Sequence, residues 1–404
     1  MQRYDTYKDS GVKWLGEIPS HWEMLPGLAI FKENKEKNSN LAVNTVLSLS
    51  YGKIVVKKDI DEGLVPAEYN TYQIVHPGYI IIRCTDLQND KVSLRTGLVK
   101  DDGIITGAYL GLVTNGKYNS SYMHYFLHAW DITKEIYRHG NGLRQSLSWL
   151  DLRRLPILIP PIAEQTAIAN YLDTATAKID AAIVQQQKII DLLNERKQII
   201  INRAVTKGLN PNAKMKDSGV EWIGEVPEGW EVRKLKHIAK LQSGETISSD
   251  SFTETGYPVF GGNGFRGYTN RYTNDGDYVL IGRQGALCGN VNYAHGQFFA
   301  SEHAVVVYPY NKENLVWLGE VIRASNLNQY SQSAAQPGLA VSLIQNICYP
   351  YPPMEERDEI ALYIEKNIKA IETGVKNYQQ QISLLQERKQ IIINEVVTGK
   401  VKVV

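Results

Sequence analysis

The sequence has little cysteine and no long apolar stretch. Its 404 residues include three cysteines, Cys84, Cys288 and Cys348, which are scattered and form no CxxC pair. An odd number of separated cysteines points to a reducing compartment and to no zinc site. The first residues hold no apolar signal core, and no run approaches the roughly 20 apolar residues of a membrane span. We therefore expect a cytoplasmic protein.

The chain also lacks an excess of either charge. Lysine and arginine number 44 against 43 aspartates and glutamates, which leaves a formal net charge of +1. Nothing in this balance indicates a nucleic-acid partner, although a local basic face would suffice. With 43% hydrophobic and 22% charged residues, the composition is that of an ordinary soluble protein, long enough for two or more domains with their own cores.

The motifs of common catalytic centres are missing as well. The chain holds no GxxxxGK[ST] phosphate loop, no GxSxG elbow and neither signature motif of the amino-methyltransferases. Gly262–Gly267 fits GxGxxG, but no helical period follows, so no helix N-terminus is present to hold a pyrophosphate. His124 and His128 share a predicted helix without the glutamate of HExxH, so we interpret them as ordinary helix positions. The sequence predicts neither a catalytic centre nor a metal site.

One stretch of the chain occurs twice. Leu193–Thr206 reads LNERKQIIINRAVT and Leu385–Thr398 reads LQERKQIIINEVVT, with 11 of 14 positions identical at an offset of 192. Each copy ends a longer segment that begins after a proline pair with acidic residues close behind. The segments stop near Gly208 and Gly399, and these are helix start and stop signals. The sequence therefore predicts two long helices related by an internal repeat.

Both predicted helices carry residues spaced four and three apart, which form a heptad seam. A period of 3.5 favours left-handed helix pairing, and the shared register indicates that the two helices pair with each other. The alternative is two unrelated surface helices on separate cores. Gln186 and Lys197 fall on the seam, where polar residues can fix register. The predicted apolar seam residues are Leu172, Ile179, Ile183, Ile190, Leu193, Ile200, Ile364, Ile371, Val375, Ile382, Leu385 and Ile392.

A second repeated stretch, here called the tryptophan motif, precedes each of two variable blocks. KDSGVKWLGEIPSHWE at Lys8–Glu23 returns as KDSGVEWIGEVPEGWE at Lys216–Glu231, at an offset of 208. We expect the indole rings to pack on the block that follows rather than to contact a ligand. The predicted domains are the first block with its motif, a helix, the second block with its motif, and a second helix, at residues 1–155, 156–209, 210–347 and 348–404.

The two blocks are predicted to be mixed structures of short strands with one helix each. Gly78–Cys84 and Asp277–Arg283 look like the same strand in two diverged copies. Polar residues gather around turns in both blocks, where Arg would suit guanine, Asn or Gln adenine, and Lys phosphates. Each residue alone is equally typical of a solvated loop, but parallel sets in two blocks favour DNA contact. The candidates are Tyr51, Lys53, Arg83, Thr85, Asp86, Gln88, Arg95, Asn263, Arg266, Tyr268, Arg283, Gln284, Ser301 and His303.

Over essentially its whole length, the chain resembles the specificity subunits of type I restriction-modification systems. The resemblance is carried by WLGEIPSHW and WIGEVPEGW, by the PP-x-x-EQ start of the first helix and by the ERKQIIIN helix ends. The second block adds GGNGFRGY and LIGRQGALCG. The second helix departs from the pattern, because Pro353 is followed by MEERDEI. That departure puts the details of docking at this helix start in doubt.

The resemblance implies a non-catalytic DNA-recognition subunit of the α+β class. Two target recognition domains in tandem would be bridged by two long antiparallel, coiled-coil-like helices with pseudo-two-fold symmetry. Each domain would read one half of an asymmetric bipartite target in double-stranded DNA. The helix pair would serve as spacer and as docking surface for two methyltransferase subunits, which motor-nuclease subunits would join.

The resemblance also implies that the chain binds no cofactor itself. S-adenosylmethionine, ATP and Mg²⁺ would be brought by the partner subunits. Two alternatives are a stand-alone DNA-binding or architectural protein and a solitary methyltransferase with diverged motifs. The missing signatures argue against the second.

Overall fold

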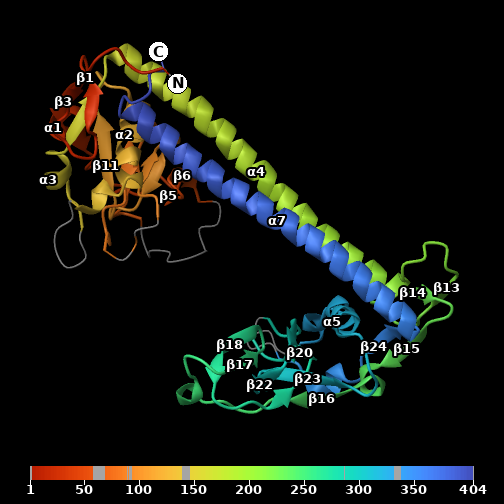
Figure 1. Cartoon of the computed structure of the whole chain (residues 1–404). Coiled ribbons are helices and arrows are strands. Elements are labelled where there is room, and N and C mark those ends of the chain that lie inside the picture. The colour runs from red at the N-terminus through yellow and green to blue at the C-terminus, as the bar shows by residue number, and fades with distance from the viewer. Residues whose placement is uncertain are drawn as a thin grey trace. The chain divides into compact units, whose positions relative to one another are not determined.

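The computed structural model describes residues 2–57, 69–88, 90, 93–138, 146–285, 287–331 and 338–403 (Figure 1). The chain forms two compact units. Unit 1 comprises Met1–Gln186 and Gln380–Val404, and unit 2 comprises Gln187–Gln379. Each unit therefore contains one tryptophan motif, one block and a part of each long helix. Among the described residues, no helix is both long enough and apolar enough to cross a membrane.

The two predicted long helices are present. Helix α4 spans Ile162–Lys207 and helix α7 spans Met354–Val397, with 46 and 44 residues. Both start directly after their proline pairs. They end at Gly208 and Gly399, whose φ angles of +70° and +74° lie in the left-handed region that favours glycine at a helix C-terminus.

The helices pair antiparallel within each unit. In unit 1, Lys389 Nζ donates to Asp180 Oδ1 at 2.7 Å. In unit 2, Lys197 Nζ donates to Glu372 Oε1 at 2.6 Å. Each residue of the first pair lies 192 positions from its counterpart in the second. The two units thus contain the same interhelix contact, and the predicted pairing of the two helices is confirmed.

The heptad seam faces the inside of this pair. All twelve apolar seam residues named above are buried or half-buried. Gln186 Nε2 donates to Gln381 Oε1 of the partner helix at 3.1 Å. The polar seam residues Gln186 and Lys197 therefore bond across the seam, which offsets the cost of burying them there.

Each block is built on a four-stranded antiparallel sheet of the same order. In unit 1 the order is β4-β11-β8-β9, and in unit 2 it is β16-β23-β20-β21. Strands β8 and β20 occupy the third position in their sheets. They come from Gly78–Cys84 and Asp277–Arg283, the two stretches predicted to be diverged copies of one strand. The bounds are β4 Phe31–Glu33, β8 Ile80–Ile82, β9 Thr96–Leu98, β11 Leu110–Thr114, β16 Ala239–Ser243, β20 Tyr278–Gly282, β21 Val291–Ala294 and β23 Ala304–Pro309.

A helix follows the sheet in each block and packs on it. Helix α2 spans Ser120–Ile132 and α5 spans Leu315–Ala324, and they correspond to the one helix predicted in each block. Both are capped by asparagine: Asn119 accepts from the Tyr122 N–H, and Asn314 from the N–H groups of Val316 and Trp317. Buried aromatic residues of these helices, such as Trp130 and Trp317, help to fill the two main cores.

The blocks differ beside this shared sheet. Unit 1 adds a hairpin, β5 Leu47–Ser50 with β6 Lys53–Val56, and a strand pair, β7 Gln73–Val75 with β10 Gly103–Ile105. Unit 2 instead adds a second four-stranded sheet of order β18-β17-β22-β19. Its strands are β17 Tyr257–Gly261, β18 Gly264–Thr269, β19 Asn274–Asp275 and β22 Gln297–Ala300. The shared frame thus carries different additions in the two blocks.

Candidate nucleic-acid interface

The tryptophan motifs attach each block to the long helices. Trp22 donates its indole N–H to Glu164 Oε2 at 3.0 Å, and Trp230 donates to Glu356 Oε2 at 2.8 Å. Glu164 and Glu356 occupy equivalent positions in the first turns of α4 and α7. The second tryptophan of each motif therefore packs on a helix start, which the sequence did not indicate.

The first tryptophan of each motif behaves as expected and packs on its block. Trp14 lies against Phe126 of α2, with ring centroids 5.6 Å apart, and Trp222 lies against Tyr349 at the same separation. Each motif is a short hairpin, β1 Tyr7–Asp9 with β2 Glu17–Pro19 and β13 Met215–Asp217 with β14 Glu225–Pro227. The motif thus holds block and helix in one piece.

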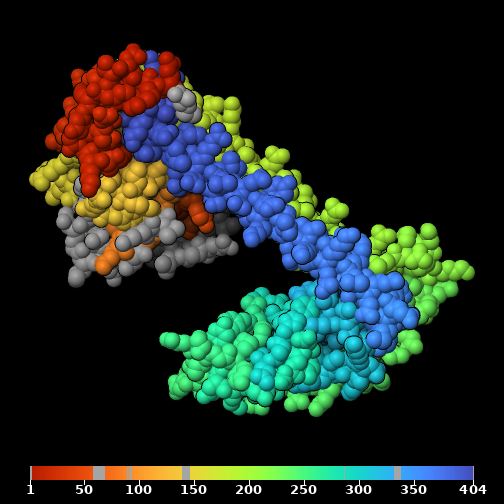
Figure 2. All heavy atoms as spheres, viewed as in Figure 1, coloured from red at the N-terminus to blue at the C-terminus, as the bar shows by residue number. Residues whose placement is uncertain are grey.

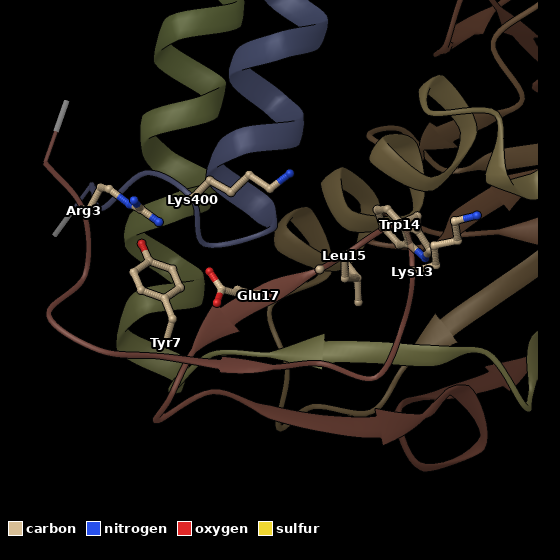
Figure 3. Close-up of a pocket in the computed structure, with 8 residues that line it drawn as sticks. Arg3, Tyr7, Lys13, Trp14, Leu15, Glu17 and Lys400 are labelled. Atoms are coloured by element: carbon tan, nitrogen blue, oxygen red, sulfur yellow. The ribbon is translucent and has the colours of Figure 1, made fainter.

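The end of α7 returns to the first tryptophan motif. Tyr7 donates its hydroxyl to the Gly399 carbonyl at 3.1 Å, and Gln2 pairs with Lys402. Figure 2 shows the N-terminal residues against the C-terminal residues on the surface of unit 1. Between them lies a hollow of about 410 Å³, where Arg3 stacks on Tyr7 and where Glu17 and Lys400 also form part of the lining (Figure 3). These contacts join the two ends of the chain in one unit.

The departure at the second helix start has a structural explanation. Gln165, buried in unit 1, accepts from the Asn119 N–H at 3.0 Å at the start of α2. Its counterpart, 192 positions later, is Arg357, which forms a buried ion pair with Glu313, directly before α5. Arg357 also stacks on Tyr351, 4.3 Å from the ring centroid. Both residues tie a helix start to the block's own helix, by a neutral contact in unit 1 and by a charged one in unit 2.

Four candidate residues of the first block share one loop after β8. Thr85 and Gln88 are exposed, and Arg83 pairs with Asp90 at 3.1 Å. Asp86 has a φ of 59°, a conformation that non-glycine residues adopt rarely and that holds this loop in a tight shape. Arg83, Thr85, Asp86 and Gln88 therefore lie together on this loop.

Arg95, also a candidate, is placed differently. It is fully buried, and its guanidinium donates to the carbonyl oxygens of Arg83, Thr85, Asp86 and Asp90. A buried guanidinium bonded to four carbonyl groups offers no surface to a base. Arg95 therefore supports the loop after β8 from inside instead of forming part of its surface.

Tyr51 and Lys53 lie on the hairpin β5–β6. Tyr51 is 92% exposed at the turn. Lys53 donates to Asp180 Oδ2 at 2.8 Å and is thus bonded to α4 in this structure. Burial raises the pKa of Asp180, but the hydrogen bonds from Lys389 and Lys53 outweigh burial and hold it below its ordinary value. One of the two hairpin candidates, Lys53, is therefore held against a long helix, and the other, Tyr51, is exposed at the turn.

In the second block, three segments meet because their glycines allow close approach. A side chain at Gly282 would collide with the Gly262 carbonyl. A side chain at Gly262 would come within 3.2 Å of the carbonyl oxygens of Gln284 and His303. The Arg283 N–H donates to the His303 carbonyl at 3.0 Å. This cluster brings Arg283, Gln284 and His303 together.

The remaining candidates of the second block lie around this cluster. Asn263 accepts from Asn290 Nδ2 at 2.9 Å, and Arg283 Nη1 donates to Ser243 Oγ at 2.9 Å. Arg266 and Tyr268 are exposed on β18. Ser301 is fully buried, so it has no surface to offer to DNA. The GxGxxG match falls on the β17–β18 turn and not at a helix start, in line with its rejection as a nucleotide site.

Sequence reasoning missed one arginine and several aromatic residues of this surface. Arg271 is exposed and pairs with Glu245 at 3.0 Å, with its guanidinium 4.7 Å from the Phe299 ring centroid. Phe265 and Tyr272 are 54% and 46% exposed. The stretch FRGYTNRY alternates arginine with aromatic residues, a pattern that suits phosphate contact combined with stacking on bases or sugars. That alternation was the available signal.

Of the two helix histidines in unit 1, His128 is buried and His124 is half-buried. Burial lowers the pKa of His124 to about 4 and that of His128 to about 3. His128 Nδ1 lies 3.0 Å from Thr96 Oγ1. In the described residues, no group of three or more His, Cys, Asp or Glu side chains could hold a metal ion. We interpret the pair as neutral core residues.

Acidification is therefore expected to destabilise unit 1. Below the ordinary histidine pKa, His124 and His128 bind protons in the unfolded chain but stay neutral in the folded chain. Asp131 has the opposite effect on stability. Burial raises its pKa to about 6, so the folded chain binds this proton more readily than the unfolded chain, and Asp131 stabilises the fold as pH falls from 6 to 4. The histidines outnumber it, so the free energy of unfolding should fall between pH 6.5 and 4, with each unmatched proton contributing about 1.4 kcal/mol per pH unit.

Urea unfolding at a series of pH values measures this dependence. His128→Leu should flatten the pH slope, whereas the same measurement on His237→Gln, at an exposed histidine of unit 2, should leave it unchanged. An unaltered slope in His128→Leu would show that His128 is protonated alike in the folded and unfolded chains.

Comparison with known proteins relates the chain to one family. The family model "Type I restriction modification DNA specificity domain" matches residues 227–380. The Escherichia coli type I restriction enzyme EcoprrI specificity subunit is 45% identical over 139 residues, which cover 33% of this chain and 35% of that protein. The putative MjaX specificity subunit of Methanocaldococcus jannaschii is 25% identical over 98% of both chains.

The fold is also found in solved structures. A chain from a structure of a type I R-M system matches 95% of this chain and 99% of its own length, with a TM-score of 0.71 and 14% identity. The HsdS subunit from Thermoanaerobacter tengcongensis covers 95% of this chain and 98% of its own, with a TM-score of 0.51 and 15% identity. The domain match at residues 227–380 and the relative that aligns with 98% of the chain thus show that this chain is similar to the specificity subunits of type I restriction-modification systems.

Proposed function

We propose that this chain reads an asymmetric bipartite DNA target, with one block for each half-site and the helix pair as the spacer between them. The observation that carries the proposal is that the two units share equivalent contacts between the tryptophan motifs and the long helices, while their blocks differ. The bonds Trp22–Glu164 and Trp230–Glu356 are equivalent, and so are the ion pairs Asp180–Lys389 and Glu372–Lys197. Two blocks that differ in structure, held by equivalent contacts, suit the recognition of two different half-sites.

The exposed chemistry of the two blocks supports different base preferences. The first block presents Thr85 and Gln88 on a loop held by buried Arg95. The second presents Arg266 and Arg271 among aromatic residues. Amide side chains suit adenine and arginines suit guanine or phosphate. The half-sites are therefore proposed to differ in sequence.

Methylation and cleavage are proposed to be carried by partner subunits. Two modification subunits would bring S-adenosylmethionine, and motor-nuclease subunits would bring ATP and Mg²⁺. The long helices have exposed apolar residues at repeat-related positions, where the modification subunits could bind. Leu192 and Ile199 of α4 are 54% and 58% exposed, and their counterparts Leu384 and Ile391 of α7 are 56% and 47% exposed.

These four residues form one apolar pair in each unit. Leu192 and Ile199 are seven residues apart and so lie on the same face of α4, as do Leu384 and Ile391 on α7. Exposed apolar residues at repeat-related positions are typical of two equivalent protein interfaces. We propose that each pair docks one modification subunit.

Charge placed on one apolar pair should therefore remove one partner and leave the other. With Leu192→Asp or Leu384→Asp, native mass spectrometry of the purified complex is expected to show one modification subunit instead of two, and the double variant none. Asn194→Asp is the control, since Asn194 is exposed about 160° away around α4. Loss of both subunits from each single variant would contradict two separate docking sites.

A further inference from the structure

The carboxylate of Asp180 joins three parts of unit 1. It lies on α4, where Oδ1 accepts from Lys389 of α7 at 2.7 Å and Oδ2 accepts from Lys53 of the hairpin β5–β6 at 2.8 Å. One side chain thus connects the first block to both helices at a point distant in sequence from the helix start. No sequence motif indicates this contact.

On the side that faces the helices, the bond from Lys53 to Asp180 holds the β5–β6 hairpin in position. On the other side, Leu47 and Ile54 are buried in a small core of the block, where Ile54 and Leu49 lie close to Gly97. Towards the helices lies a groove of about 1110 Å³, lined by the hairpin, by His128 of α2 and by residues of α4 and α7. The bond from Lys53 to Asp180 therefore spans the edge of a groove and does not continue a packed core.

Loss of the carboxylate would do more than remove two hydrogen bonds. Lys53 and Lys389 would be left as two like charges around one position, and they would repel each other. Because a groove lies behind the hairpin, the hairpin has room to move in response. The position of its exposed turn, with Tyr51 and Gly52, would then be less well defined.

The other unit provides a natural comparison. Glu372 is the repeat counterpart of Asp180 and pairs with Lys197, the counterpart of Lys389, at 2.6 Å. Among the described residues of unit 2, its ion pair joins the two helices and includes no residue of the second block. The interhelix part of the contact is shared by both units, whereas the link to a block is found in unit 1.

We propose that Asp180 is a positioning residue that fixes the β5–β6 hairpin of the first block against the helix pair and thereby sets how strictly the spacer length of the DNA target is read. The inference rests on the proposed function. A hairpin held at two points cannot follow a half-site that is displaced by one base pair. A hairpin released from the helices can.

The test compares Asp180→Asn with Glu372→Gln in the full complex with modification subunits. Both substitutions remove one interhelix ion pair, and Asp180→Asn alone also releases the hairpin. Methylation rates are measured on duplexes that carry the native spacer or one longer or shorter by one base pair. Asp180→Asn should reduce discrimination against the altered spacers about two- to fivefold, the effect of losing one partly exposed ion pair, with base preferences in both half-sites retained. Asp180→Glu should restore discrimination.

Equal spacer profiles for Asp180→Asn and Glu372→Gln would overturn the inference, because the effect would then belong to the helix pair. Hydrogen exchange of the free protein gives a second test that does not involve DNA. The amides of β5 and β6 should exchange faster in Asp180→Asn than in Glu372→Gln, and equal exchange would also overturn it. If the wild-type complex methylates no split target while the exchange difference is present, the proposed function fails and the hairpin contact stands.

Discussion

Removal of one heptad from each long helix is expected to move the preferred spacer by about three base pairs. Deleting Gln185–Asp191 from α4 and Asn377–Ser383 from α7 takes facing segments from the antiparallel pair and keeps the seam in phase. Seven residues shorten a helix by about 10 Å, and one base pair spans about 3.4 Å. Neither deletion touches the ion pairs at Asp180 and Glu372 or the exposed apolar pairs.

The original spacing should then be read poorly, because DNA would have to deform to bring both half-sites onto the blocks. Such deformation costs on the order of 1–6 kcal/mol, so methylation at the original spacing should fall at least about fivefold. Rates on a series of duplexes with spacers from four base pairs shorter to four longer give the new optimum. Unchanged base preferences in both half-sites serve as the control for intact blocks. A shortened protein that still prefers the original spacer would show that the helices do not set it.

Arg266→Ala is expected to weaken recognition of one half-site and leave the other untouched. Arg266 is exposed on β18, beside the cluster of Arg283, Gln284 and His303, and has a phenylalanine ring, that of Phe252, 5.7 Å from its guanidinium carbon. An arginine that reads a guanine contributes about 1–3 kcal/mol of discrimination, which is roughly a 5- to 150-fold effect. Competition binding with duplexes substituted in one half-site at a time measures the loss.

Lys312→Ala is the matched control for this substitution. Lys312 is an exposed cation that follows the C-terminal end of β23, whereas His303 of the cluster lies before the N-terminal end of β23. Lys312→Ala therefore removes one positive charge, as Arg266→Ala does, but at the opposite end of β23 from the cluster. A uniform loss of affinity for all sequences in Arg266→Ala, with a weaker salt dependence, would indicate a phosphate contact. Unchanged preference at every position would remove β18 from the recognition surface.

The frame of the protein could be predicted from sequence because it is written twice. Helix starts and stops, the heptad seam and the tandem order of motifs follow from local signals that recur at offsets of 192 and 208. The strand β20 was recognisable from its likeness to β8. Each helix or strand signal occurs in two copies, so the second copy supports the prediction made from the first, and such local signals are the ones from which structure is predicted best.

The contacts that define the candidate surface could not be predicted in the same way. Arg95 looked like a base-reading residue because its charge is visible in sequence and its burial is not. Lys53 bonds to Asp180, 127 residues away, and Trp22 to Glu164, 142 residues away. The second sheet of unit 2 was missed as well, since its parallel β17–β22 pairing joins distant segments. Such pairings depend on tertiary packing and carry no local signature.

The central claim is tested most directly by co-expressing the chain with its cognate modification subunit and mapping methylated adenines across the host genome by single-molecule sequencing. We predict one split motif with two unlike halves and a fixed gap. A continuous motif, or a split motif with identical halves, would contradict the account of one block for each half-site. No stable complex with the modification subunit would contradict the account as well and would favour a stand-alone DNA-binding protein.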